Sequence, residues 1–510
     1  MKTVRKLVVV GGGSSGWMTA AYLSRVLFDI HITLIESKVT PVIGVGEATV
    51  PFLNHFMNRL GFSDYRQWLA ECDGTIKTGI LFENWLEKGD SYWHPFEQLE
   101  YLDDRRHTGH AWVAWRHSGN PEFQTRRSFY DSFYASTRLN SVENRAPVMK
   151  EFAYHLNADL FGFLLRRSSP AVRHVQDDVV DVRLDATGAI ASLITAENGE
   201  FTADLFIDCT GWRRILMRSV GAEQPFQSYS ASLFCDRAVV LRFPYGPEAT
   251  RGTEMNPYVK ASARSAGWIW TIPLYSRISS GYVYSSSFLS DAAAEQELCA
   301  YWGEARTDGI APHRIRFEAG KYRDLWVRNC VAVGLAGGFI EPLESTGLAI
   351  TQMGIEMLAS VLDARYFDDF IVLRYNAHLE KFCADILQFI TSHYCFTRRE
   401  DTPFWRAVKH ETQIPDDLRA RHEIFQRYLP SVATKGLSEA WMFRDISWFS
   451  VLLGMDFPFD PQDVPAELLL RAGEIRERKA RIVREMSLKI PGHYEYLREN
   501  LYTQEAESVR

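Results

Sequence analysis

The chain has 510 residues, more than one hydrophobic core usually serves, so we expect two or more modules. Its formal net charge of −7 at pH 7 argues against nucleic acid or an anionic membrane surface as a partner. The 7 cysteines are scattered without a C-x-x-C pair, which predicts reduced thiols, a cytoplasmic location and no metal site.

The N-terminal stretch predicts a strand, a glycine turn and a helix. Residues 6–10 form a β-branched run typical of a buried parallel strand, and the run is too short for a signal peptide or a membrane span. Gly11, Gly13 and Gly16 then occupy the G-x-G-x-x-G positions, which allow a tight turn, close approach of a pyrophosphate and close packing of the next helix. We expect that helix over residues 17–27, with its N-terminal amides facing phosphate groups.

Glu36 ends a second expected strand, His31–Ile35, and lies 20 residues beyond Gly16, where the ribose of a dinucleotide needs a hydrogen-bond acceptor. Strand, turn, helix, strand and acid in this order predict a dinucleotide site, with Ser14 and Ser15 among its residues. The alternative is a glycine turn without a nucleotide.

The loop over residues 42–51 surrounds one acid with two glycines and a proline. Because it follows the Glu36 strand directly, we expect it to contact the nucleotide through residues that include Ala48. The alternative is a plain turn.

Lys77 lies in a half-apolar, strand-like segment, although most lysines are solvated. His94-Pro95-Phe96 belongs to a run of aromatic residues at 92–96. Such a run is typical either of a core corner or of a wall on which a planar substrate stacks.

Further strands are predicted over residues 179–184 and 190–194. Another apolar strand is predicted within residues 203–212, and its Cys-Thr-Gly end suits a backbone that lies close to a cofactor. In residues 267–274, strand alternation places Trp268 and Trp270 on one face. That aromatic face is either core or a plug that narrows a cofactor cavity.

A third unit of strand followed by glycines spans residues 330–338 and adds Gly334 and Gly337 to the cofactor-binding candidates. Apolar spacing then predicts a helix over residues 348–362, with Ser345 or Thr346 as its N-cap. Free amides at such a helix start bind anions.

Glu344 lies directly before this helix, where a carboxylate is favoured by the helix dipole. Residues 365–510 favour helices, among them residues 378–394 and 467–486. The alternating charges of the latter predict a solvated face.

Four motifs together resemble the flavin-dependent tryptophan halogenases: the glycine turn, G-V-G-E-A-T at residues 44–49, W-x-W-x-I-P at residues 268–273, and E-P-L-E-S-T-G at residues 341–347. The W-x-W-x-I-P motif distinguishes this family from ordinary flavin hydroxylases. The resemblance covers nearly the whole chain and is clearest before residue 400.

The resemblance implies an α/β (α+β) fold of two entwined modules. Residues 1–375 would form a Rossmann-like FAD-binding module of the aromatic-hydroxylase type, with substrate-side segments near residues 86–150 and 226–314. Residues 376–510 would form a largely helical module that covers the substrate.

The resemblance also implies a reaction. A separate flavin reductase supplies reduced FAD, which with oxygen and chloride or bromide yields hypohalous acid. This oxidant reaches an electron-rich aromatic ring, guided by the ammonium of Lys77, while Glu344 polarises the oxidant and accepts the ring proton. The backbone at Thr346 and Gly347 matches the halide site of the family.

The resemblance assigns His94 and Phe96 to stacking on the substrate ring. It assigns Trp268 and Trp270 to the region between flavin and substrate. The tyrosine pair that holds the amino-acid backbone in tryptophan-specific members reads here as Trp448 and Phe449.

Met455 stands where those members carry a glutamate. We therefore expect an indole-like ring rather than free tryptophan as substrate.

Two other functions are open at this point. An FAD-dependent aromatic hydroxylase shares the fold but does not need Lys77, Glu344 and the paired tryptophans together. A non-catalytic flavin-binding sensor has no use for a halide site. Since the sequence shows no second glycine loop for a nicotinamide dinucleotide, we expect FAD to be reduced only by a separate reductase, in an enzyme that can form a homodimer.

Overall fold

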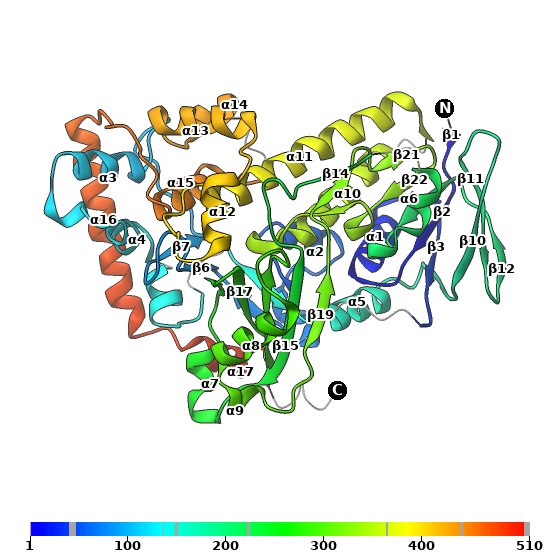
Figure 1. The fold of residues 1–510 in the computed structure, drawn as a ribbon, viewed down its shortest axis with the longest axis horizontal. Helices are drawn as coiled ribbons and strands as arrows, with labels where there is room; N and C mark the ends of the chain where they lie inside the picture. Colours follow the sequence, from blue (N-terminus) through cyan, green and yellow to red (C-terminus); the bar gives the residue numbers. More distant parts are fainter. Residues whose placement is uncertain are drawn as a thin grey trace. The chain divides into compact units, whose positions relative to one another are not determined.

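The structure is a computed structural model that describes residues 2–39, 47–135, 137–147, 151–221, 225–363, 366–438 and 442–503. Its internal contacts divide the chain into two compact units (Figure 1). The first unit comprises Met1–Gly74, Leu156–Ser230 and Phe317–Ala384, and the second comprises Thr75–His155, Ala231–Arg316 and Asp385–Arg510. Each unit is assembled from separate stretches of chain, as entwined modules require. The assignment of residues 1–375 and 376–510 to flavin and substrate modules stays a prediction.

The first unit is built on a largely parallel sheet with β2 at its centre. The apolar strands predicted around the glycine turn are present and buried, which confirms the predicted dinucleotide-binding pattern at the level of the fold. In the described residues the strand order gives β9 (Arg173–Gln176), β3 (His31–Glu36), β2 (Lys6–Val10), β13 (Leu205–Asp208), β22 (Cys330–Ala332) and the antiparallel edge strand β21 (Trp326–Val327).

Helix α1 (Ser14–Val26) packs against the sheet and against α5 (Ala158–Arg167) and α10 (Gly347–Leu362). It begins three residues before the expected start at residue 17, because the amide of Trp17 already donates to the carbonyl of Gly13 at 3.0 Å. The serines and the third glycine of the turn are therefore part of the first helical turn, with their amides at the helix N-terminus.

The remaining elements of the first unit are smaller. An antiparallel sheet contains the strands predicted near residues 179–184 and 190–194. The bounds are β1 (Lys2–Thr3), β4 (Glu47–Ala48), α2 (Leu53–Arg59), β10 (Val179–Leu184), β11 (Ile190–Thr195), β12 (Gly199–Phe201), α6 (Ile215–Val220), β14 (Phe226–Ser228), β20 (Gly320–Tyr322), β23 (Gly338–Phe339) and β24 (Tyr366–Phe367).

The second unit contains a larger sheet that is antiparallel except where β6 pairs with β16. Outside this larger sheet, β5 (Thr75–Lys77) pairs antiparallel with β8 (Ala153–Leu156), and β5 carries the lysine singled out in the sequence. The order of the larger sheet in the described residues is β19 (His313–Arg316), β15 (Arg237–Pro244), β18 (Arg277–Tyr284), β17 (Gly267–Pro273), β16 (Val259–Ala263), β6 (Gly79–Glu83) and β7 (Ser91–Pro95).

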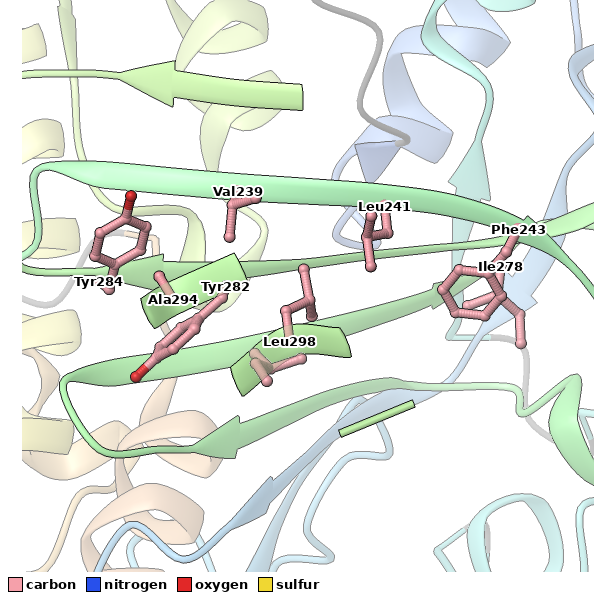
Figure 2. Close-up of a cluster of buried hydrophobic side chains, with 9 residues drawn as sticks. Val239, Leu241, Phe243, Ile278, Tyr282, Tyr284, Ala294 and Leu298 are labelled. Carbon is pink, nitrogen blue, oxygen red and sulfur yellow. The ribbon is translucent and has the colours of Figure 1, made fainter. Parts of the chain in front are cut away.

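One face of this sheet buries a hydrophobic cluster against α8 (Asp291–Trp302), which contributes Ala294 and Leu298 (Figure 2). Ile269 of β17 belongs to this cluster. Since neighbouring residues of a strand point to opposite faces, Trp268 and Trp270 lie on the other face, as the alternation predicted.

Helices make up most of the rest of the second unit (Figure 1). They are α3 (Thr108–His117), α4 (Arg127–Phe133), α7 (Glu248–Glu254), α9 (Glu304–Thr307), α12 (Pro403–Glu411), α13 (Asp416–Tyr428), α14 (Lys435–Ser438), α15 (Asp445–Gly454), α16 (Ala466–Ser487) and α17 (His493–Asn500). The boundary between the units falls inside the long helix α11 (Asp369–Cys395).

The predicted solvated face of α16 is present, but Lys479 lies on the packed side of the helix. This side chain is buried, and its ammonium pairs with Glu97 at 2.6 Å and with Glu100 at 3.1 Å. The reason is that α16 packs on other elements of the unit, including α3 and α4, so a lysine on the packed side needs buried carboxylate partners.

Candidate functional site

The glycine turn has the backbone that a pyrophosphate site requires. Gly11 has φ +117°, and its amide donates to the carbonyl of Ile35 at 2.8 Å. A Cβ on Gly16 would overlap the carbonyl oxygen of Gly11, so only glycine allows α1 to begin so close to the strand. A Cβ on Gly13 would meet no atom within 4 Å, which leaves open space at the start of the helix.

The start of α1 offers backbone amides to an anion. Gly13 occupies the N-cap position, where it has no side chain to cap the helix, and the first turn of α1 contains no acidic residue. Gly334, with φ +68°, lies against this turn, because a Cβ there would overlap the hydroxyl of Ser15. The structure thus brings together the first and third glycine units of the sequence, and their residues fit the phosphates of a dinucleotide.

Glu36 lies over the same turn. Its carboxylate Oε2 accepts from Nε2 of His174 at 2.7 Å, and a Cβ on Gly12 would overlap the Glu36 side chain. Trp17 packs edge-on against His174, with ring centroids 5.1 Å apart. No sequence signal marked His174, which reaches Glu36 because β9 pairs with β3.

The loop after Glu36 is described only in part. Ala48 lies in β4 and is half-buried, whereas Gly44 and Gly46 of the predicted loop lie outside the described residues. Gly337 lies against Leu325, on the short turn that follows β22. The contact of this loop with a nucleotide stays a prediction.

The segment before α10 forms a buried helix start. Glu344 is 1% exposed and ends a short 3-10 turn, and Ser345 then adopts φ +60° before the helix begins at Gly347. Thr346 occupies the N-cap position, as predicted, but it does so in a helical conformation and without a capping hydrogen bond. Within the described chain its buried hydroxyl has no hydrogen-bond partner, and the first turn has no acidic side chain, which leaves a helix start suited to a small anion.

In the second unit, Lys77 is fully buried at the end of β5, with Nζ 5.2 Å from the centre of the Phe96 ring. The backbone on both sides is fixed. The amide of Ile76 donates to His493, and the amide of Thr78 donates to the carbonyl of Pro257 at 2.7 Å. A buried, rigidly held lysine is rare among structural lysines, so its position supports a chemical role.

His94 belongs to a buried aromatic cluster that the sequence predicted only in part. Its ring lies 5.6 Å from Phe389 and 6.2 Å from Phe443, and these two phenyl rings stack with centroids 3.7 Å apart. Trp448 packs edge-on against Phe389 at 4.9 Å. Phe389 lies in α11 and Phe443 lies just before α15, and no sequence signal marked either residue.

Trp448 and Phe449 have different neighbours, because consecutive residues of a helix point about 100° apart. The guanidinium of Arg421 lies 4.7 Å from the Trp448 ring and pairs with Asp385 at 2.6 Å. The Phe449 ring instead contacts the residues His107, Phe129 and Phe459, at 5.3, 5.0 and 5.3 Å.

The paired tryptophans lie next to each other on β17, with ring centroids 6.3 Å apart. Trp268 also contacts Trp85 at 6.5 Å, and Trp270 covers Gly281 of β18. Both are buried side chains of a rigid sheet.

The described residues contain no group of three or more His, Cys, Asp or Glu side chains that could hold a metal ion. Among the described helices, none combines the length and the apolar character needed to cross a bilayer. The predicted nucleotide and halide residues and Glu344 belong to the first unit, whereas Lys77 and the aromatic residues belong to the second.

Comparisons with protein families and with curated relatives point to the same family. The tryptophan halogenase family model matches residues 6–467. Tryptophan 6-halogenase ThaL of Streptomyces albogriseolus is 35% identical over 84% of this chain and 83% of its own length, and tryptophan 7-halogenase RebH of Lentzea aerocolonigenes is 34% identical over 84% and 82%.

Solved structures agree over nearly the full length. Tar14, a tryptophan C-6 flavin-dependent halogenase from taromycin biosynthesis, superimposes with a TM-score of 0.88 at 32% identity, covering 98% of this chain and 100% of that chain. BrvH, a flavin-dependent halogenase from Brevundimonas sp. BAL3, superimposes with a TM-score of 0.84 at 28% identity, covering 98% and 99%. The chain therefore belongs to the tryptophan halogenase family, whose flavin-dependent members halogenate an aromatic ring.

Proposed function

We propose that this halogenase receives reduced FAD from a separate flavin reductase and halogenates an indole-like ring without an amino-acid tail. Family membership sets aside the aromatic hydroxylase and the flavin-binding sensor as alternatives. The observation that carries the substrate assignment is the apolar packing of Trp448 and Phe449, where the resemblance expects a tyrosine pair. The cytoplasmic location and the homodimer stay predictions.

FAD and a halide are the co-reactants of this family, and FAD supplies the oxidising chemistry when it is bound. The amides of Ser14, Ser15 and Gly16 would hold the pyrophosphate, and Glu36 would accept from the ribose. Gly334 keeps the approach to this turn free of side-chain atoms.

The halide would lie at the start of α10. Backbone amides at Thr346 and Gly347 point out of the helix N-terminus, where the dipole favours a negative charge. The unmatched hydroxyl of Thr346 adds a donor at the same place. Each of these groups is a neutral hydrogen-bond donor that suits a small monovalent anion, so chloride and bromide both fit.

Lys77 would direct the oxidant. A buried ammonium can donate a hydrogen bond to hypohalous acid, and burial strengthens this interaction by excluding water. After the ammonium loses a proton, the amine can instead react with hypohalous acid to form a haloamine and release water. Glu344, which is also buried, would take the proton released from the ring.

The surroundings of Trp448 argue against an amino-acid tail. Arg421 and Asp385, the charged groups beside this ring, pair with each other. The indole N–H of Trp448 has no acceptor among the described residues, and one neutral donor cannot match both an ammonium and a carboxylate. His94, Phe96 and Phe389 still offer flat apolar surfaces to an electron-rich ring.

The test is a reaction that contains the protein, a flavin reductase, NADH, FAD, oxygen, bromide and indole. Mass spectrometry is expected to show product with the isotope pair of one bromine. Product with an added oxygen would instead support a hydroxylase. Absence of any modified ring, with indole and with a panel of larger aromatics, would overturn the proposal.

A further inference from the structure

His155 of β8 has a fixed tautomer. Its Nδ1 lies 2.7 Å from the hydroxyl oxygen of Thr75, and that hydroxyl donates its one proton to the carbonyl of Pro273 at 2.6 Å. Because a hydroxyl has a single proton, Thr75 must accept from His155, and Nδ1 must carry the proton. The other ring nitrogen, Nε2, therefore carries no proton and can only accept a hydrogen bond.

That lone pair is unmatched. His155 is fully buried, and Nε2 has no hydrogen-bond partner within the described part of the chain. Burial and the nearby positive charge of Lys77 lower the pKa of His155 well below its usual value, so the ring stays neutral. A buried acceptor left without a donor is rare in native proteins and points to a group that binds there during function.

The strand register directs His155 toward Lys77. Thr75 pairs with His155, and Lys77 pairs with Ala153. Thr75 and Lys77 share one face of β5, because they are two residues apart, so His155 is the diagonal neighbour of Lys77 on that face.

A second histidine holds the backbone directly before the lysine. Nδ1 of His493 donates to the carbonyl of Met255 at 2.9 Å, which leaves Nε2 to accept from the amide of Ile76 at 3.4 Å. Both histidines are thus neutral acceptors around Lys77. His493 uses its lone pair on the backbone, and His155 keeps its lone pair available.

We propose that His155 is a positioning residue for Lys77: its Nε2 accepts a hydrogen bond, direct or through one water, from the Lys77 ammonium and holds that ammonium toward the oxidant. The proposal rests on the proposed role of Lys77 in halogen transfer. On its other side the His155 ring donates to Thr75, and Thr75 donates to the carbonyl of Pro273. The orientation of the ring therefore depends on the end of the W-x-W-x-I-P strand.

Two substitutions separate this role from simple packing. In His155→Asn the amide nitrogen takes the place of Nδ1 and keeps the bond to Thr75, but nothing reaches the position of Nε2. In His155→Gln the longer side chain places an acceptor at the position of Nε2. FAD affinity and thermal midpoint serve as controls for the fold in both variants.

The measured quantity is halogenated indole formed per reduced FAD consumed, with a scavenger to detect oxidant released into solution. We expect His155→Asn to lose about tenfold to a hundredfold of this ratio and to release more oxidant, the effect of losing one hydrogen bond to a charged group. His155→Gln should recover most of the ratio. If His155→Asn forms as much halogenated indole per reduced FAD as His155→Gln, or more, the role of His155 is structural and the proposal is wrong.

A readout without catalysis keeps the proposal separate from the proposed function. In protein labelled with ¹⁵N-histidine, with FAD and bromide present, the Nε2 signal of His155 is expected to shift on Lys77→Met, because its donor is removed. An unchanged signal would overturn the positioning role even if indole is halogenated. A shifted signal in a protein that halogenates nothing would support the contact and overturn only the proposed function.

Discussion

The six-membered ring of Trp270 covers Gly281, its direct partner across the β17–β18 ladder. A Cβ on Gly281 would overlap the carbons of that ring. The glycine therefore sets how closely the second tryptophan of W-x-W-x-I-P lies on the sheet, and its lack of a side chain is a packing requirement rather than a conformational one.

We expect Gly281→Ala to push Trp270 off the sheet and to lower the free energy of unfolding by about 1–3 kcal/mol, the usual cost of an extra methyl in a packed core. Denaturant unfolding followed by tryptophan fluorescence measures this. Gly473→Ala is the matched control, since a Cβ on this helical residue meets no atom within 4 Å. The free energy of unfolding of the control should stay unchanged or rise by up to about 1 kcal/mol. An equal fall in the free energy of unfolding of both variants would contradict the packing argument.

Lys77→Met removes the ammonium and keeps most of the side-chain volume. We expect halogenated product to disappear while oxygen still oxidises the reduced flavin, because the lysine acts on the oxidant after it has formed. Product and oxygen uptake are measured in the same reaction. Lys38→Met, at an exposed residue, should leave both unchanged. Substantial product from Lys77→Met would remove this residue from the mechanism.

Glu344→Gln keeps the shape of the side chain and removes the base. General-base losses are about a hundredfold to ten-thousandfold, so halogenation of indole should slow into that range. Glu356→Gln, on the same helix α10, removes a carboxylate that bonds to Gln352 and should leave the rate unchanged. If Glu344→Gln slows halogenation by less than about threefold, Glu344 is not the base, and its carboxylate only interacts with the dipole at the helix start.

Burial lowers the pKa of His493 to about 4, whereas the unfolded chain has a histidine pKa near 6.5. The folded protein therefore binds fewer protons than the unfolded chain between these values, and its stability must fall as the pH drops from 6.5 to 4. The slope contributed by this one group approaches about 1.4 kcal/mol per pH unit.

His493→Gln should flatten this part of the pH profile of unfolding, and the exposed control His313→Gln should not. Urea unfolding at a series of pH values from 4 to 7 compares the three proteins. An unchanged slope in His493→Gln would show that this histidine is protonated in the folded protein.

The sequence predicted the nucleotide half of the fold because its signals are local. Strand, glycine turn, helix and acid follow one another within residues 6–36, and each step has a steric reason that one residue type satisfies. The tryptophan face of β17 was predictable for the same reason, since alternation is a property of one strand.

The surroundings of Lys77 could not be predicted, because they come from distant segments. Ile76 and His493 are 417 residues apart in sequence, and Thr75 and Pro273 are 198 apart. Local reasoning located the start of α10 and its N-cap residue correctly, but it could not show that Ser345 is left-handed or that Thr346 makes no capping hydrogen bond.

The substrate prediction depends on charge. Free tryptophan brings an ammonium and a carboxylate, and burying either without a partner costs several kcal/mol, whereas the charges beside Trp448 already pair with each other. At about 1.4 kcal/mol per factor of ten, equimolar competition should favour indole over tryptophan by at least about tenfold. Tryptamine and indole-3-propionate, which each carry one of the two charges, then show which charge the site rejects. If halotryptophan dominates, polar partners for the tail exist in this site, and the comparison of Trp448 and Phe449 with the tyrosine pair is wrong.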